Sequence, residues 1–201
     1  MGILGVNRYE IDGAKELLDL SLPGDWIMRT DSPVEGRLKA LESIIRSDTG
    51  QVIHFERRPV EREVAVARGS YAFHSEPKAY DPMGVNIFAD TLDTSQGAGG
   101  GSGTLTEFLQ WTGNLILIPI LNETKETAAL QVTWRNNHSS HLDRIPAADR
   151  PAKIDMVLAN LAKQTSLQFT RERRSIDVWF VTEQPASPPG KGPAAEPRAG
   201  V

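Results

Sequence analysis

Apolar positions recur at helical spacing in two separate stretches of the chain. The first stripe consists of Val34, Leu38, Leu41, Ile44 and Ile45, and the second consists of Ile154, Val157, Leu158 and Leu161. Residues three and four positions apart share one face of a helix, so each stripe predicts an amphipathic helix. Ser32 is the expected N-cap of the first helix, with Pro33 at its first position and Glu35 closing a capping box. That helix is expected to end near Gly50, and the second to begin near Pro151.

Two short apolar runs follow each predicted helix. They cover residues 51–56 and 60–67 after the first helix, and residues 167–171 and 176–182 after the second. The runs are separated by Arg57-Arg58-Pro59 and by Glu172-Arg173-Arg174-Ser175. Such short connections between apolar runs predict two antiparallel hairpins.

The remaining pattern adds weaker elements on both sides of a glycine-rich stretch. A short helix is expected over residues 13–20 and a strand over residues 26–29. Later in the chain we expect a helix over residues 105–112, an apolar strand over residues 115–121 and an alternating strand over residues 130–135. Pro119 makes the apolar strand an edge or a bulge, because proline cannot donate to a ladder.

The two helix-hairpin stretches align at a constant offset. Moving forward by 116 positions places Leu38 on Ile154, Ile45 on Leu161 and Thr49 on Thr165. This layout favours a duplication, although coincidence explains so short a match equally well. The predicted fold is α+β: two similar strand-helix-strand-strand modules, each with an antiparallel sheet covered by helices.

Composition sets the domain limits. The stretch over residues 94–103 has five glycines and two serines, which is typical of a flexible connector. From residue 185 the chain has five of its 13 prolines and almost no large apolar side chain, which predicts a disordered tail. We therefore expect a first module over residues 1–93, the glycine-rich loop over 94–103, a second module over 104–184 and the tail over 185–201.

Charge and hydropathy exclude some classes of protein. The net charge of -4 disfavours a general nucleic-acid binder, which needs a broad basic face. The longest apolar run, residues 115–121, is too short to span a bilayer, so no transmembrane segment is expected in this chain. The absence of cysteine excludes disulfides, thiolate metal sites and cysteine nucleophiles.

Several short motifs match catalytic or binding patterns only by letter. The glycine run lacks the ending of a phosphate-binding loop, and its expected role is a connector with Thr104 capping the next helix. Ser102 lacks the preceding strand of a nucleophile elbow. Ser75-Glu76-Pro77-Lys78 matches the Ser-x-x-Lys motif of penicillin-recognising enzymes, but its proline disfavours the helix that this motif needs. His138, His141 and Asp143 are expected in a solvated loop. We therefore expect no catalytic, cofactor-binding or metal-binding residue, and a chain that is not an enzyme.

The arginines of the predicted hairpin tips are the candidate anion-binding residues. Arg57 and Arg58 lie at one tip and Arg173 and Arg174 at the other, where guanidinium groups can grip an anion in bidentate fashion. Glutamates beside them reduce the local positive field, and polar solvated turns are the simpler interpretation. Trp134 and the other strand tryptophans are expected in the core or at an interface.

Three stretches resemble the soil-associated bacterial proteins that contain the DUF3738 domain. They are residues 40–73, residues 105–134 and residues 154–183, which follow that family's order of helices and alternating strands. Asn122 and Lys125 depart from the family pattern, as expected of a divergent relative. The third stretch is also similar to the short N-terminal domain of secretins and TonB-dependent receptors.

The resemblance implies an exported α+β domain without an assigned activity, periplasmic or otherwise extracytoplasmic, sometimes fused to a thioredoxin-like or membrane peptidase region. The leading hypothesis is a non-catalytic, protein-binding domain of the bacterial cell envelope, in which Leu115, Leu117 and Pro119 form the partner-binding edge. The alternative is a sensor of small anionic ligands. A hydrolase that uses Ser102, His138 or His141 is the least favoured hypothesis.

Overall fold

The computed structural model divides the chain into two compact units. It describes residues 6–22, 27, 29, 31–75, 83–88, 98–126, 129–137, 142 and 145–184. Unit 1 consists of Met1–Ile11 and Arg57–Val178, and unit 2 consists of Asp12–Glu56 and Trp179–Val201. Each unit therefore takes segments from distant parts of the sequence, and their limits differ from the module limits expected at residues 93 and 104.

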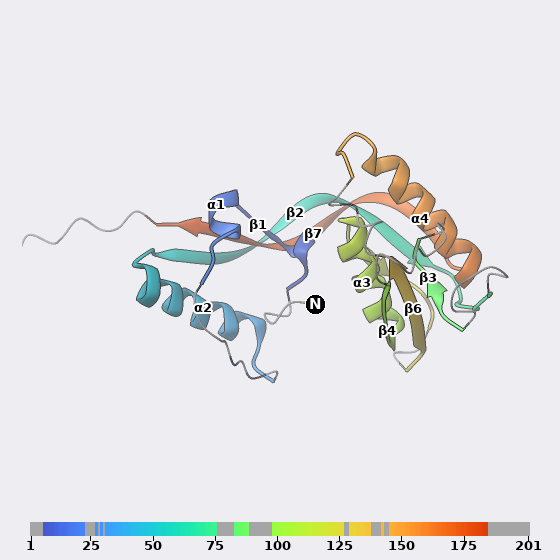
Figure 1. Cartoon of the computed structure of the whole chain (residues 1–201), viewed down its shortest axis with the longest axis horizontal. Helices are drawn as coiled ribbons and strands as arrows, with labels where there is room; N and C mark the ends of the chain where they lie inside the picture. Colours follow the sequence, from blue (N-terminus) through green and yellow to red (C-terminus); the bar gives the residue numbers. More distant parts are fainter. Residues whose placement is uncertain are drawn as a thin grey trace, which may run out of the picture. The chain divides into compact units, whose positions relative to one another are not determined.

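The predicted α+β class is confirmed (Figure 1). In chain order the elements are η1 (Arg8–Glu10), β1 (Ile11–Gly13), α1 (Lys15–Leu18), α2 (Val34–Thr49), β2 (Ile53–Arg68), β3 (Val85–Asn86), β4 (Ala98–Thr104), α3 (Leu105–Ile116), β5 (Ile120–Asn122), β6 (Gln131–Asn137), α4 (Arg150–Thr165) and β7 (Gln168–Glu183). Among these described elements, no helix is long and apolar enough to cross a membrane. The predicted tail over residues 185–201 lies outside the described residues.

The strands form two mixed sheets. One has the order β1-β7-β2-β5 and the other has the order β3-β6-β4. β2 pairs with β5 in parallel, and β3 pairs with β6 in parallel, whereas β4 and β6 are antiparallel. The expectation of purely antiparallel sheets is therefore wrong. Two parallel strands need a long connection between them. The sequence prediction relied on short turns, so it did not detect these parallel pairs.

Both predicted hairpins are wrong, because β2 and β7 run without a turn through the expected tips. Ion pairs join Arg57 to Asp177 at 2.8 Å and Glu63 to Arg171, so the two strands pair with each other in opposite directions (Figure 1). The expected turns contain no residue that favours positive φ. Pro59 is tolerated within β2 because β5 pairs only with residues 65–67 of that strand.

Both helices of the predicted repeat are present at the predicted offset. Helices α2 and α4 have 16 residues each and lie 116 positions apart. Both end on a residue in the left-handed region, Gly50 with φ 75° and Ser166 with φ 57°. The hydroxyls of Thr49 and Thr165 each donate to the carbonyl four residues earlier, at 2.7 Å in both helices. The two helices therefore share their end geometry at corresponding positions, and the duplication stays a prediction.

The start of α2 differs from the prediction. The helix begins at Val34, and Pro33 is at the N-cap position without a side-chain cap bond. The predicted Ser32 cap is therefore wrong by one position. The expected helix over residues 13–20 is reduced to α1, since residues 11–13 form β1. The strand expected over residues 26–29 lies largely outside the described residues.

The apolar run over residues 115–121 is not one strand. Helix α3 continues to Ile116, Leu117 adopts φ 59°, and only Ile120–Asn122 is extended. Leu115 and Ile116 extend the buried helix face of Phe108, Leu109 and Thr112, which outweighs the strand propensity of the run.

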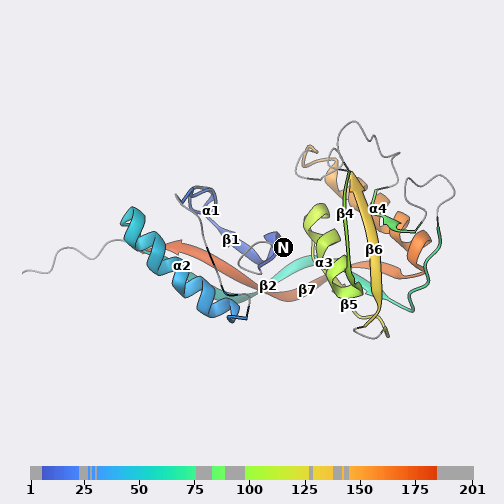
Figure 2. The ribbon, with the colours of Figure 1, turned by 60° about the horizontal axis from the view of Figure 1, so that its bottom comes forward.

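The core of unit 1 forms where α3 and α4 pack on the strands. Helix α3 contacts β4, β5 and β6 (Figure 2), and α4 contacts β3 (Figure 1). The predicted stripe of α4 is buried in this cluster, with Leu161 fully inaccessible. In unit 2 the α2 stripe is covered less completely, since Leu38 and Ile45 are buried but Leu41 and Ile44 are half-buried.

Two glycines of the α2 region provide a matched test of backbone conformation. A Cβ at Gly36 or at Gly50 meets no atom within 4 Å, but only Gly50 has positive φ. We expect Gly36→Ala to raise the free energy of unfolding by about 0.5–1 kcal/mol, because alanine favours the helix. We expect Gly50→Ala to lower it by about 1 kcal/mol, because a side chain is strained in the left-handed region. Urea denaturation measures both, and a rise for Gly50→Ala contradicts the assignment.

Candidate functional site

Strand β4 is the glycine-rich end strand of the β3-β6-β4 sheet in unit 1. Seven of its residues pair with β6, from Ala98 opposite Asn137 to Thr104 opposite Gln131. The predicted flexible connector is therefore wrong for residues 98–103, which form an ordered ladder. Residues 94–97 lie outside the described residues.

The hydrogen-bond phase of this ladder shows which backbone groups point outward. The N–H of Leu105 donates to the carbonyl of Leu130 at 3.1 Å, one step beyond the Thr104–Gln131 pair. Because bonded and non-bonded pairs alternate in an antiparallel ladder, residues 99, 101 and 103 bond β6. Gly100 and Ser102, both exposed, direct their N–H and C=O groups away from β6.

Thr104 ends the strand and begins α3. Its hydroxyl accepts from the N–H of Glu107 at 3.2 Å, and the Glu107 carboxylate accepts from the N–H of Thr104 at 2.7 Å. The predicted cap of Thr104 is thus confirmed as a complete capping box. The bonds that the Glu107 carboxylate accepts from the N–H and from the hydroxyl of Thr104 lower the pKa of Glu107 below its ordinary value.

Trp134 on β6 leaves no room for a side chain at two glycines of β4. A Cβ at Gly101 would lie 2.9 Å from Cζ2 of the Trp134 indole, and one at Gly100 would lie 2.4 Å from the Trp134 carbonyl oxygen. The indole therefore lies against the strand where other residues would carry a side chain. The alternate glycines at 99, 101 and 103 were a sequence signal of close packing on one strand face, which the loop interpretation missed.

Trp134 also has an unused donor. Its side chain is 4% exposed and contacts the rings of Phe108 and Trp111 at centroid distances of 5.7 and 6.3 Å. Its buried Nε1 has no hydrogen-bond partner among the described residues. Buried donors without partners are rare in proteins and call for an explanation.

A network of ion pairs in unit 1 joins β2, β7 and the residue that follows β5. Arg68 donates to Glu172 at 2.6 Å and to Glu123 at 2.9 Å. Arg174 bonds the same two carboxylates, at 2.7 Å to Glu172 and 3.5 Å to Glu123. Hydrogen bonds from Arg68 are the main cause that lowers the pKa of Glu172 to about 2. The network contains two cations and two anions, so its charges cancel locally.

The predicted anion-binding arginines therefore lie on strands rather than at hairpin tips. Arg57 pairs with Asp177, and Arg174 belongs to the network with Glu123 and Glu172. Arg58 and Arg173 are exposed on β2 and β7. An added anion at Arg57 or Arg174 would compete with carboxylates that are already in contact.

The predicted partner-binding edge is also placed differently. Leu115 is buried within α3, and Leu117 packs partly buried against the core. Pro119 lies beside β2, where its carbonyl accepts from the N–H of Ala65 at 2.9 Å. Strand β5 does end its sheet, but it is only three residues long.

The other candidate residues are not brought together. Ser102 lies on β4, His74 bonds the hydroxyl of Ser166 at 2.7 Å, and His54 lies 3.1 Å from Glu42. His138, His141 and Asp143 are outside the described residues, as are Glu76, Pro77 and Lys78. Within the part of the chain that is described, no three His, Asp or Glu side chains are arranged to hold a metal ion.

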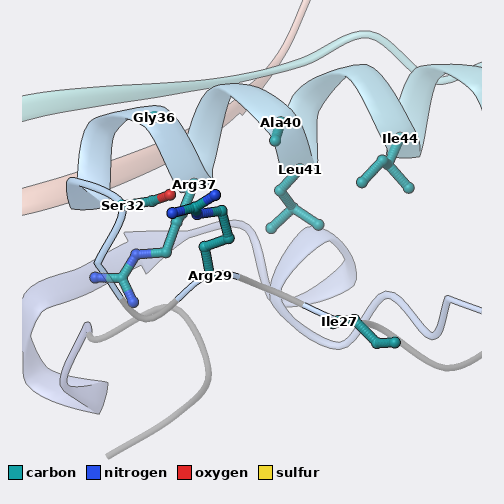
Figure 3. A pocket seen from close by; sticks show the side chains of 8 residues that line it. All are labelled: Ile27, Arg29, Ser32, Gly36, Arg37, Ala40, Leu41 and Ile44. Atoms are coloured by element: carbon teal, nitrogen blue, oxygen red, sulfur yellow. The ribbon is translucent and has the colours of Figure 1, made fainter.

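Unit 2 contains a pocket of about 210 Å³ beside the first turns of α2 (Figure 3). Gly36, Ala40 and Ile44 line it along one row of the helix, and Arg37 and Leu41 line it along the next row. The facing wall includes Ile27 and Arg29. The half-buried state of Leu41 and Ile44, on a stripe predicted to be buried, is the consequence of this opening.

Comparisons with protein-family models, with curated proteins and with solved structures found no match for this chain. The resemblance to DUF3738 proteins consequently stays a prediction.

The ion-pair network predicts acid-sensitive stability. Glu172 has a pKa of about 2 in the folded chain and an ordinary value of 4.5, so its contribution is present above pH 4.5 and is lost as the pH falls toward 2. We expect Glu172→Gln to flatten the fall in the free energy of unfolding across this range, measured by urea denaturation at several pH values. Glu183→Gln, near the end of β7, is the control. An unchanged slope in Glu172→Gln contradicts the role of the network.

Proposed function

We propose that this chain is a non-catalytic interaction domain that binds an extended polypeptide segment by adding it to β4. The observation that carries the proposal is the seven-residue end strand, whose outer backbone groups at Gly100 and Ser102 face away from β6. An extended segment can pair with such groups and gain main-chain hydrogen bonds.

The composition of β4 supports this use. End strands usually carry lysine, proline or an inward charge, which discourage pairing with other chains. Residues 98–104 contain none of these, and four of them are glycine. A partner strand therefore meets little side-chain obstruction along this edge.

The unused donor of Trp134 supports a preference for partner segments that carry a hydrogen-bond acceptor. A Cβ at Gly101 would lie 3.5 Å from Nε1 of Trp134, so the unused donor lies close to β4. Binding a segment with an acceptor side chain, such as Asn, Gln, Ser or Thr, next to Gly101 gives this N–H a partner. We include in the proposal the extracytoplasmic location and the bacterial envelope context that the DUF3738 resemblance implies.

The direct test removes one outward donor and leaves the ladder to β6 in place. Heptapeptides are selected from a random display library on the wild-type chain, and their affinities are measured for Ser102→Pro and Ser102→Ala. We expect Ser102→Pro to bind at least about tenfold more weakly, a loss of about 1.4 kcal/mol, because proline has no N–H to donate. Ser102→Ala keeps the donor and should bind like the wild type.

Two readouts make the result decisive. The amide signals of Gly100 and Ser102 in ¹⁵N spectra should shift on peptide binding, and both variants should keep the wild-type spectrum elsewhere. Equal peptide affinity for Ser102→Pro and the wild type, or shifts confined to other strands, contradicts binding at β4.

The donor of Trp134 gives a separate prediction. Trp134→Phe removes a buried N–H that has no described partner, so we expect the loss of stability to come from packing alone, about 1–3 kcal/mol. We expect the affinity for selected peptides with Asn or Gln to fall more than the affinity for peptides with Ala at the same position. Equal losses for both peptide classes would show that the indole N–H takes no part in recognition.

A further inference from the structure

The pocket beside α2 divides into an apolar part and a cationic part. Leu41, Ile44 and the fully exposed Ile27 lie toward one end, and Arg29 and Arg37 lie toward the end near Ser32 (Figure 3). All of these residues belong to unit 2. A pocket that is apolar at one end and cationic at the other matches an amphiphile with one negative head group.

The cationic end has donors for such a head group. Arg29 uses Nε and Nη2 to bond Asp31, at 3.0 and 2.8 Å. A guanidinium has five N–H donors, so Arg29 keeps further donors while it is held in place by Asp31. Arg37 adds a second positive charge to this end, and the acidic residues of the same stretch are Asp31 and Glu35.

The helix itself adds to the preference for an anion. Gly36 lies in the first turn of α2, ahead of the first intrahelical bond, from the N–H of Arg37 to the carbonyl of Pro33 at 3.1 Å. The N–H groups in the first turn of a helix carry partial positive charge. The Gly36 position is open, since a Cβ there meets no atom within 4 Å.

We propose that this pocket binds a small monocarboxylate with a short alkyl chain. The carboxylate lies between Arg29 and Arg37, and the alkyl chain covers Leu41, Ile44 and Ile27. The volume of about 210 Å³ lies below the roughly 300–1,000 Å³ of sites for drug-sized ligands, which limits the occupant to a smaller molecule. The site is independent of β4, which belongs to unit 1.

The test titrates the full chain with octanoate, with octanol as a neutral probe and with octyltrimethylammonium as a cationic one. We expect octanoate to shift the amide signals of Gly36, Ala40 and Leu41 with a Kd below about 1 mM, and at least tenfold more tightly than octanol. The cationic probe should not shift these signals. Equal affinity for octanoate and octanol overturns recognition of the carboxylate, and shifts confined to β4 overturn the location.

Two helix variants separate occupancy of the pocket from a change in folding. Gly36→Leu places a side chain in the open pocket, and Ser43→Leu adds the same side chain to an exposed position of α2 outside it. We expect Gly36→Leu to weaken octanoate binding at least tenfold while keeping the spectrum of the folded chain. Ser43→Leu should bind like the wild type. Unchanged binding by Gly36→Leu overturns the proposal, and it leaves the β4 experiment unaffected.

Discussion

The pairing of β2 with β7 is the interaction on which both units depend. Each strand contributes one part to unit 1 and the other part to unit 2, so neither unit forms from one contiguous stretch of chain. The middle of the pair is exposed and charged rather than buried, and ion pairs such as Arg57 with Asp177 define the register there. Hydrogen bonding and charge complementarity therefore replace apolar burial in this part of the sheet.

The proposed binding edge follows from a packing requirement. Trp134 occupies space that side chains of β4 would otherwise fill, so the strand is built from glycine where it faces the indole. The same residues leave the outer edge without large or charged side chains. A constraint from the core thus produces a strand that is easy to pair with, and it connects the fold of unit 1 to the proposed function.

Local pattern predicted the helices well. The stripe of Ile154, Val157, Leu158 and Leu161 is buried, and Thr104 caps α3 as expected, because periodicity and capping depend on residues a few positions apart. The strands were predicted less well. The local pattern predicts a turn at residues 57–59, whereas Arg57 pairs with Asp177 on β7, more than a hundred positions away. It predicts a strand over residues 115–121, whereas Leu115 is buried on helix α3.

Local spacing and backbone preference predict the α+β class, the two amphipathic helices and the end of the first helix at Gly50. Tertiary structure alone decided that the glycine-rich stretch is a strand, because its pairing needs Trp134 and the rest of β6 beside it. It also decided which arginines are neutralised and where α2 leaves a pocket. Contacts between distant residues set these features, and hydrophobic periodicity carries no information about which distant residues meet.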